Sequence, residues 1–214
     1  MDRNKLTWGS CNSVKKYKEN RYKNPDQRLV SYTERRLVRN ILSRVLEYRR
    51  IILDIPCGYG RFSDLLSNYS TELVSADLNI YALNLIRDDH RHIYSLSFFE
   101  YVNSDILSLP FKCDTFDLVF CFRLLQHFKG FDTVKFTLRE LIRVSRRYVL
   151  FSIYIENPLH RIMRIARDFD MNIFMISKDR LRSILQELNV RIIYAKRILP
   201  YFHANTIILV EKIS

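Results

Sequence analysis

The chain has 214 residues, of which 48% are apolar, so it is long enough for one α/β domain with a sizeable core. No apolar run approaches the roughly 20 residues that span a membrane, and no apolar signal segment follows the first residues, so we expect a cytoplasmic protein. The four cysteines lack metal-ligand spacing, which favours free thiols in a reducing compartment and no bound metal.

The formal net charge of +12 is concentrated near the N-terminus. Residues 1–50 contain fourteen Lys or Arg against five Asp or Glu, a balance of +9. Such an end attracts polyanions, an anionic membrane surface or phosphorylated and carboxylated substrates, and it equally suits a solvated surface. Charge alone does not choose among these partners, so peripheral association with the inner membrane face stays open.

The polar residues 1–28 are expected to form a basic arm or lid. Aromatic residues alternate there with lysines and arginines, and Pro25 marks a turn. This pattern favours an amphipathic flap over a nucleic-acid contact. Residues 29–48 then repeat apolar side chains at helical spacing and predict a helix on the sheet. The candidate lid residues on the substrate side are Tyr17, Tyr22, Arg28 and Tyr32.

The stretch from Ile51 to Phe62 predicts a strand, a glycine turn and the start of a helix. The apolar run ends at Asp54, and the chain then turns through Gly58 and Gly60. Glycine lets the backbone approach a ligand closely, with the helix N-terminus facing it, as in nucleotide-binding α/β sheets. Glycine turns also occur where nothing binds, so this signal is weak by itself.

Strands and helices continue to alternate along the chain. Strands are expected over residues 72–76, 98–103, 116–122 and 148–153, and helices over 80–88, 132–145 and 177–188. The β-rich runs 191–198 and 205–211 predict a closing antiparallel hairpin. The rhythm indicates an α/β fold with a Rossmann-like, doubly wound, mostly parallel seven-stranded sheet, as a single domain over residues 29–214. Residues 155–176 fit neither period and are expected to be a substrate-side insertion.

Three acids follow three consecutive predicted strands: Asp54, Asp77 and Asp105. The carboxyl ends of parallel strands form the ligand crevice of an open sheet. A carboxylate at Asp77 suits two ribose hydroxyls, and Asp105 followed by an apolar residue suits an adenine edge. Each acid alone equally suits a helix cap. Together they predict one shared site.

These segments resemble class I S-adenosylmethionine-dependent methyltransferases over roughly residues 28–212. The resemblance rests on Asp54-Ile-Pro-Cys-Gly-Tyr-Gly-Arg61, Ala76-Asp-Leu-Asn79, Asn103-Ser-Asp-Ile-Leu-Ser-Leu-Pro-Phe111 and Phe116-Asp-Leu-Val-Phe-Cys-Phe-Arg-Leu-Leu-Gln-His-Phe128. Pro56 stands where the commonest pattern has glycine, as in a subgroup with a Pro-Cys-Gly-x-Gly-Arg motif. The resemblance implies S-adenosylmethionine as cofactor, bound by Asp54, Ile55, Pro56, Cys57, Gly58, Gly60, Arg61, Asp77, Leu78, Asn79, Asp105, Ile106 and Phe122.

The choice of acceptor is narrowed by absences. No Asn-Pro-Pro-aromatic or Asp-Pro-Pro-aromatic motif follows the fourth strand, which disfavours methylation of an exocyclic amine of a base. Cys57 lies in the glycine turn rather than at the fourth strand or beyond, so a cysteine-nucleophile mechanism on cytosine lacks support. O-methylation of a small-molecule, sugar or lipid-linked acceptor, such as a lipopolysaccharide sugar, is therefore the first expectation. His127 is the candidate base for a hydroxyl, unless it merely packs a helix. Tyr59 and Arg123 are candidates for the floor of the acceptor site.

Two other readings stay open. A nicotinamide dehydrogenase would use Gly58-x-Gly60-x-x-Ser63 as its fingerprint, but no downstream segment offers a hydride-site acid and base. An RNA-binding methyltransferase, or a non-catalytic cofactor-binding partner, would use the basic N-terminal arm. Salt-dependent binding to nucleic acid would favour the RNA reading.

Overall fold

A seven-stranded sheet organises the fold. The computed structural model describes residues 9–46, 50–90, 98–156, 173–198 and 204–213. The strands follow the order β3-β2-β1-β4-β5-β7-β6. Strands β1, β2 and β3 pair in parallel, as do β4 and β5, whereas β7 is antiparallel to both β5 and β6. The predicted mostly parallel, Rossmann-like sheet with an antiparallel C-terminal hairpin is therefore confirmed.

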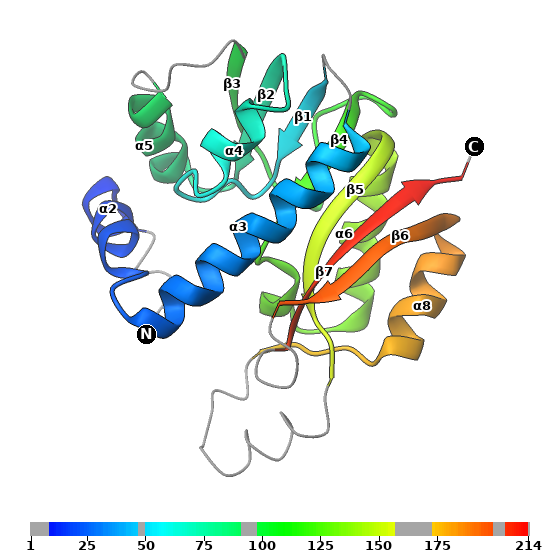
Figure 1. Ribbon diagram of the computed structural model, residues 1–214. Coiled ribbons are helices and arrows are strands. Elements are labelled where there is room, and N and C mark those ends of the chain that lie inside the picture. Colours follow the sequence, from blue (N-terminus) through cyan, green and yellow to red (C-terminus); the bar gives the residue numbers. More distant parts are fainter. Residues whose placement is uncertain (1–8, 47–49, 91–97, 157–172, 199–203, 214) are drawn as a thin grey trace. The chain divides into compact units, whose positions relative to one another are not determined.

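The chain divides into two compact units, residues 1–110 and 111–214. The division into an arm over residues 1–28 and a domain over residues 29–214 stays a prediction. The first unit contains α2 (Cys11–Asn20), α3 (Pro25–Val45), β1 (Ile51–Asp54), α4 (Ser63–Ser67), β2 (Glu72–Asp77), α5 (Ile80–His90) and β3 (Phe98–Asn103) (Figure 1).

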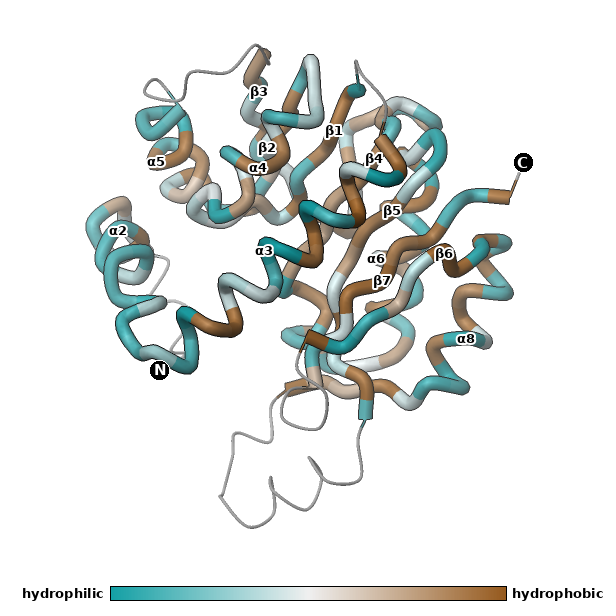
Figure 2. Tube along the Cα trace, viewed as in Figure 1, coloured by the Kyte–Doolittle hydropathy of each residue, from teal (hydrophilic) through white to brown (hydrophobic). Residues whose placement is uncertain are grey.

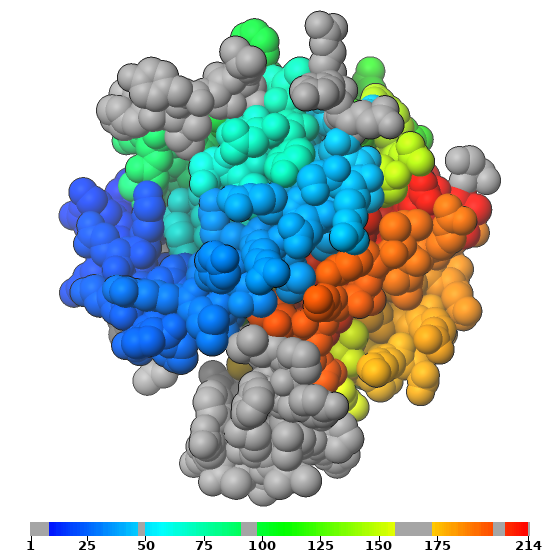
Figure 3. Space-filling view, in the orientation of Figure 1, coloured from blue at the N-terminus to red at the C-terminus, as the bar shows by residue number. Residues whose placement is uncertain are grey.

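Helix α3 begins four residues before the predicted start. Pro25 takes its first turn, where the missing N–H costs nothing and the fixed φ suits a helix. The predicted apolar positions Leu37, Val38, Ile41 and Leu42 are buried, and the opposite side of α3 is exposed along its length (Figure 3). The expected arm over residues 1–28 therefore includes all of α2 and the first turn of α3.

Two arginines join α3 to the glycine turn. The Arg61 guanidinium donates to Glu34, a carboxylate that is completely buried on α3. In the other direction, Arg35 of α3 donates to the backbone carbonyl of Arg61 at 2.7 Å and to both carboxylate oxygens of Asp64 at 3.0 and 2.6 Å. The turn and the helix are therefore held by paired charges on both sides.

The second unit contains β4 (Phe116–Cys121), the 3₁₀ turn η1 (Leu125–His127), α6 (Phe131–Val144), β5 (Ser145–Tyr154), α8 (Lys178–Glu187), β6 (Val190–Arg197) and β7 (Asn205–Lys212). Every residue of β4 is buried, including Asp117, which forms an ion pair with Arg146. Ser177 caps α8 by accepting from the Arg180 amide, as expected. Along α8 hydrophilic and hydrophobic positions alternate, and β7 is largely hydrophobic (Figure 2).

Some expectations fall on residues that are not described. Residues 157–172 of the predicted insertion and residues 199–203 of the hairpin turn lie outside the described ranges. The described ends of the insertion meet, because Ile155 and Ile176 form a parallel bridge. Among the described residues, no helix has the length and apolar character needed to cross a membrane.

Burial of the Glu34–Arg61 pair predicts that two nearby substitutions lower the free energy of unfolding by very different amounts. Glu34→Ala leaves the largely buried Arg61 guanidinium without its buried carboxylate, so we expect a loss of about 3–5 kcal/mol in the free energy of unfolding. Asp64→Ala removes an exposed partner of Arg35 and should cost less than about 1 kcal/mol. Urea denaturation monitored by circular dichroism measures both, and equal losses would contradict the assignment.

Candidate functional site

The glycine turn lies against the end of β2. The Cys57 amide donates to the Ala76 carbonyl at 2.9 Å, and the Gly60 amide donates back to the Cys57 carbonyl at 3.0 Å. Gly58 and Gly60 have φ values of +56° and +77°, in the left-handed region that favours glycine. A Cβ at Gly60 would also lie 3.0 Å from Ile86 Cγ1, so a side chain there would have to displace Ile86 slightly as well as adopt a strained φ.

Asp77 is the hydrogen-bond acceptor that organises the turn. One carboxylate oxygen accepts from the Gly58 amide at 2.8 Å, and the other accepts from the Asn79 amide at 2.8 Å. The Asn79 side chain in turn accepts from the Tyr81 amide at 2.9 Å, at the beginning of α5. The end of β2, the glycine turn and the start of α5 are thus fixed to each other by one carboxylate and one amide.

Two further ionisable groups lie close to Asp77. Asp54 is 2% exposed, and burial, followed by repulsion from Asp77, raises its pKa well above 3.8. Burial and the same two carboxylates also raise the pKa of the Cys57 thiol. Burial raises the pKa of Asp77 itself, while the Asn79 and Gly58 amides oppose the shift. The carboxyl ends of β1 and β2 therefore form an environment that disfavours further negative charge and keeps the Cys57 thiol protonated.

The end of β3 lies directly beside the end of β2. Asn103 is the register partner of Asp77, and its side-chain amide donates to the Asp77 and Leu78 carbonyls, each at 2.9 Å. Two residues later Asp105 is exposed, and its carboxylate accepts from the Leu107 amide at 2.9 Å. Ile106 behind it is buried. The backbone thus brings Asp77 and Asp105 to the same end of two adjacent strands.

These residues fit an adenosyl group. Leu78 is 70% exposed between Asp77 and the start of α5, so an apolar surface lies next to a carboxylate. The buried Ser104 hydroxyl, between Asn103 and Asp105, has no hydrogen-bond partner among the described residues. An apolar surface at Leu78 with carboxylate acceptors on neighbouring residues suits a nucleoside.

Four of the predicted substrate-side residues form one aromatic and basic cluster. The Tyr17 and Tyr59 rings meet edge to face with centroids 5.9 Å apart, and Arg61 lies 5.0 Å above the Tyr22 ring. Arg28 donates to the Tyr22 carbonyl at 3.0 Å. Burial and the Tyr22 hydroxyl raise the pKa of Tyr59. The N-terminal segment thus contacts the glycine turn, whereas Tyr32 is 66% exposed.

The Arg61 guanidinium differs from the other predicted cofactor groups in its environment. It pairs with Glu34 and contacts the Ser31 hydroxyl at 3.3 Å, both on α3. Its structural role is to hold α3 against the turn. Reasoning from the sequence missed Glu34, Arg35 and Asn103. A signal existed for Glu34, which falls three and four residues before Leu37 and Val38 on the buried stripe.

The remaining predicted site residues belong to the second unit. Phe122 is buried and stacks on Phe120 with centroids 5.4 Å apart. Arg123 has φ +59°; its amide donates to Ser152 Oγ at 2.8 Å, and its guanidinium donates to the Tyr154 hydroxyl at 3.2 Å. His127 is exposed at the end of η1. Phe122, Arg123 and His127 follow the carboxyl end of β4, as predicted.

The raised pKa of Asp54 predicts that replacing its carboxyl with an amide stabilises the folded protein at high pH. Between 3.8 and its raised pKa the folded state binds more protons than the unfolded state, so the stability contributed by Asp54 falls as pH rises through that window. Above it, Asp54→Asn should stabilise the ligand-free protein by about 1.4 kcal/mol for each tenfold difference in proton affinity.

Thermal unfolding at pH 8 and pH 4 measures this effect, and the gain should shrink at the lower pH. Asp105→Asn is the matched control, because Asp105 is exposed and an asparagine oxygen can still accept from Leu107. An Asp54→Asn variant that is less stable at pH 8 would contradict the burial of a costly charge.

Comparison with known proteins shows which proteins this chain is similar to. Residues 53–153 match the family model described as a methyltransferase domain. An uncharacterised protein of Methanocaldococcus jannaschii is 35% identical over 77 residues, which is 36% of this chain and 29% of that protein's length.

Solved structures share the fold. A magnesium protoporphyrin IX methyltransferase from Synechocystis, with bound S-adenosylhomocysteine, is 15% identical and has a TM-score of 0.75, over 89% of this chain and 88% of that one. A S-adenosylmethionine-dependent methyltransferase from Methanosarcina mazei is 19% identical with a TM-score of 0.68, over 81% of this chain and 97% of that one. These solved structures thus share the fold of this chain, and the match to the methyltransferase domain model covers residues 53–153, a little less than half of the chain.

Proposed function

We propose that this chain is a S-adenosylmethionine-dependent methyltransferase that acts on a hydroxyl group of a small-molecule, sugar or lipid-linked acceptor. The observation that carries the proposal is the Asp77 carboxylate, which is held at the glycine turn by the Gly58 and Asn79 amides. Each of its oxygens retains acceptor capacity, so the pair can receive both hydroxyls of a ribose. The family match over residues 53–153 supports the same assignment.

The residues around Asp77 would hold the other parts of the cofactor. Asp105 and Ile106 provide an acceptor and an apolar contact for an adenine ring, beside exposed Leu78. A ligand ammonium group beside Asp54 would favour the ionised form of this carboxyl, which burial and Asp77 otherwise disfavour. When bound, S-adenosylmethionine supplies a methyl carbon activated by a sulfonium. The task of the protein is then to align an acceptor oxygen with that carbon.

A hydroxyl acceptor loses its proton as it is methylated, and exposed His127 at the end of η1 is our candidate to take it. Two features support an oxygen acceptor over a nucleobase acceptor, one for each of two nucleobase reactions. The Cys57 thiol is buried with a raised pKa, so it is a poor nucleophile. Cys121-Phe-Arg-Leu stands where an exocyclic-amine methyltransferase would carry its proline motif.

The acceptor itself is best found by experiment. The Synechocystis enzyme acts on magnesium protoporphyrin IX, but 15% identity carries the fold and not the substrate. Purified protein with methyl-labelled S-adenosylmethionine should label a component of a lipid, glycan or small-molecule extract. Label found in RNA, together with RNA binding that falls steeply with salt, would overturn the proposed acceptor class.

Removing the Asp77 charge should weaken cofactor binding. We expect Asp77→Asn to lower the affinity for S-adenosylhomocysteine at least tenfold, because one charged acceptor of two ribose hydroxyls is lost. Glu72→Gln, at the opposite end of β2, is the matched control and should bind normally. Isothermal titration calorimetry measures both. Equal affinities of the two variants would refute the ribose assignment.

Removing the imidazole of His127 should slow methyl transfer without affecting the cofactor. For His127→Ala we expect a fall in kcat of about 10²-fold or more, since general bases typically contribute 10²–10⁴-fold. Affinity for S-adenosylhomocysteine should stay within twofold of wild type. Full activity, measured with the acceptor found above, would make His127 a surface residue with no catalytic role.

A further inference from the structure

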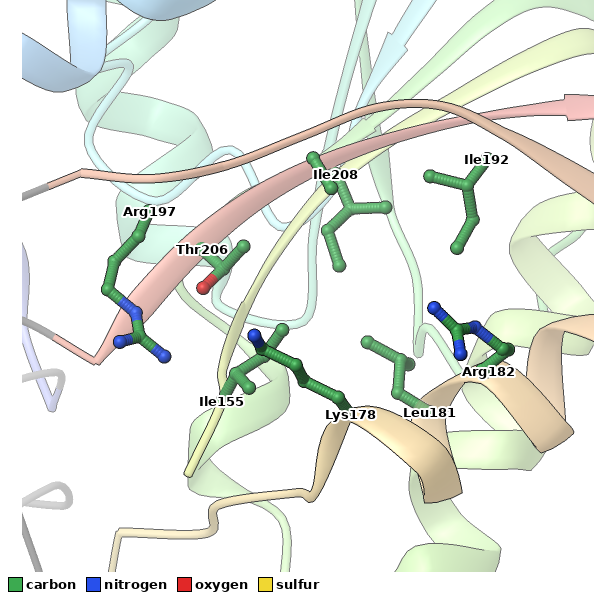
Figure 4. A pocket seen from close by; sticks show the side chains of 9 residues that line it. Ile155, Lys178, Leu181, Arg182, Ile192, Arg197, Thr206 and Ile208 are labelled. Carbon is green, nitrogen blue, oxygen red and sulfur yellow. The ribbon is translucent and has the colours of Figure 1, made fainter. Parts of the chain in front are cut away.

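The second unit contains a pocket that the methyl-transfer site does not account for. It has a volume of about 500 Å³ and lies between α8 and the strands β6 and β7, all of which belong to this unit. Both α8 and β6 reach the surface (Figure 3). The lining residues are Ile155, Lys178, Leu181, Arg182, Ile192, Ala195, Arg197, Thr206 and Ile208 (Figure 4). A pocket of this size suits a small organic ligand.

The lining separates into an apolar middle and a cationic border. Ile192 and Ile208 point from the strands toward Leu181 on α8, while Lys178 and Arg197 lie on one side of them and Arg182 lies on the other (Figure 4). Among the described residues, the lining includes three cations and no acid. Such a lining favours a ligand with a negative charge and an apolar body.

The three cations are not paired with protein carboxylates in the described part of the chain. Lys178, Arg182 and Arg197 have no ion-pair partner there, although the second unit pairs many of its other cations. The described ion pairs of this unit are Lys135–Glu187, Arg143–Glu140, Arg146–Asp117, Arg147–Glu211, Arg191–Glu211 and Lys212–Asp114. Cations without acidic partners are thus gathered at this pocket, where an anion could bind without competing with a carboxylate.

A bulge in β6 is what turns Arg197 toward the pocket. Ile192 pairs with Val210 and Tyr194 with Leu209, so Ile193 is an extra residue in the strand. Side chains normally alternate along a strand, and one inserted residue reverses the alternation beyond it. Ala195 and Arg197 therefore share a face with Ile192, whereas a regular strand would direct them to the other face.

We propose that this pocket binds an anionic amphiphile, a molecule with one carboxylate or phosphate group on a single alkyl or aromatic body. Lys178, Arg182 and Arg197 receive the anion, and the isoleucines with Leu181 cover the apolar part. The site does not depend on methyl transfer, so its binding is measured without cofactor.

Decanoate and decyl phosphate, below their micelle concentrations, are the probes for calorimetric titration of the full chain. Decanol tests the apolar body alone, and inorganic phosphate tests the charge alone. We expect saturable one-to-one binding of at least one anionic probe, at least tenfold tighter than decanol or phosphate. The preferred probe distinguishes a carboxylate ligand from a phosphate ligand.

Variants locate the binding site. The double variant Lys178→Ala/Arg197→Ala should lower the affinity for the preferred probe about tenfold or more. Ala195→Phe should prevent the probe from binding, because the larger side chain fills the pocket. Lys196→Ala is the matched control, because Lys196 adjoins Arg197 on the opposite face of β6. Each variant should retain wild-type affinity for S-adenosylhomocysteine, which shows that it is folded.

Decanol or inorganic phosphate that binds as tightly as the anionic probes would overturn the pocket proposal. So would a loss of binding in Lys196→Ala equal to that in the double variant, or binding that occurs only to anionic vesicles. A protein that binds S-adenosylhomocysteine but none of the amphiphiles would likewise refute this site while leaving the proposed function intact. A protein that binds an amphiphile but not S-adenosylhomocysteine would support the pocket and refute the proposed function.

Discussion

The first unit depends on two hydrogen bonds to one carboxylate. Asp77 ends β2 and accepts from the Gly58 amide of the glycine turn and from the Asn79 amide before α5. Charge-assisted hydrogen bonds of this kind are among the stronger ones in proteins, and they hold in place both segments that would surround a nucleoside. The oxygens that shape the turn are the same ones that we propose receive the ribose.

The other charged groups of the first unit differ in how far they are buried. The Glu34–Arg61 pair is almost completely removed from solvent and fixes α3 to the glycine turn, whereas Arg35 and Asp64 form an exposed pair beside it. Asp54 is buried close to a second carboxylate, which opposes ionisation. A bound cation would relieve that repulsion. The Asp54 carboxyl therefore lowers the stability of the ligand-free protein but would raise its affinity for a cationic group.

The strands and the order of the acids could be predicted because they depend on local signals. Apolar runs marked β1, β2 and β4, and glycines with positive φ marked the turn. Ser177 marked the start of α8 by its capping chemistry. The pairing of Glu34 with Arg61 spans 27 residues in the sequence and depends on tertiary packing, which local periodicity does not contain. The bulge at Ile193 was missed for the same reason, since it is defined by the partner strand.

The left-handed backbone at Arg123 has a consequence for how this position can change. A residue with a side chain is uncommon at φ +59° and costs on the order of 1–3 kcal/mol there, a cost that glycine would avoid. The chain instead keeps an arginine whose amide, carbonyl and guanidinium are all engaged, by Ser152, Gln126 and Tyr154. Substitution by glycine would remove the backbone strain and the guanidinium together. Backbone stability therefore favours glycine at this position, whereas the contact with Tyr154 requires the arginine.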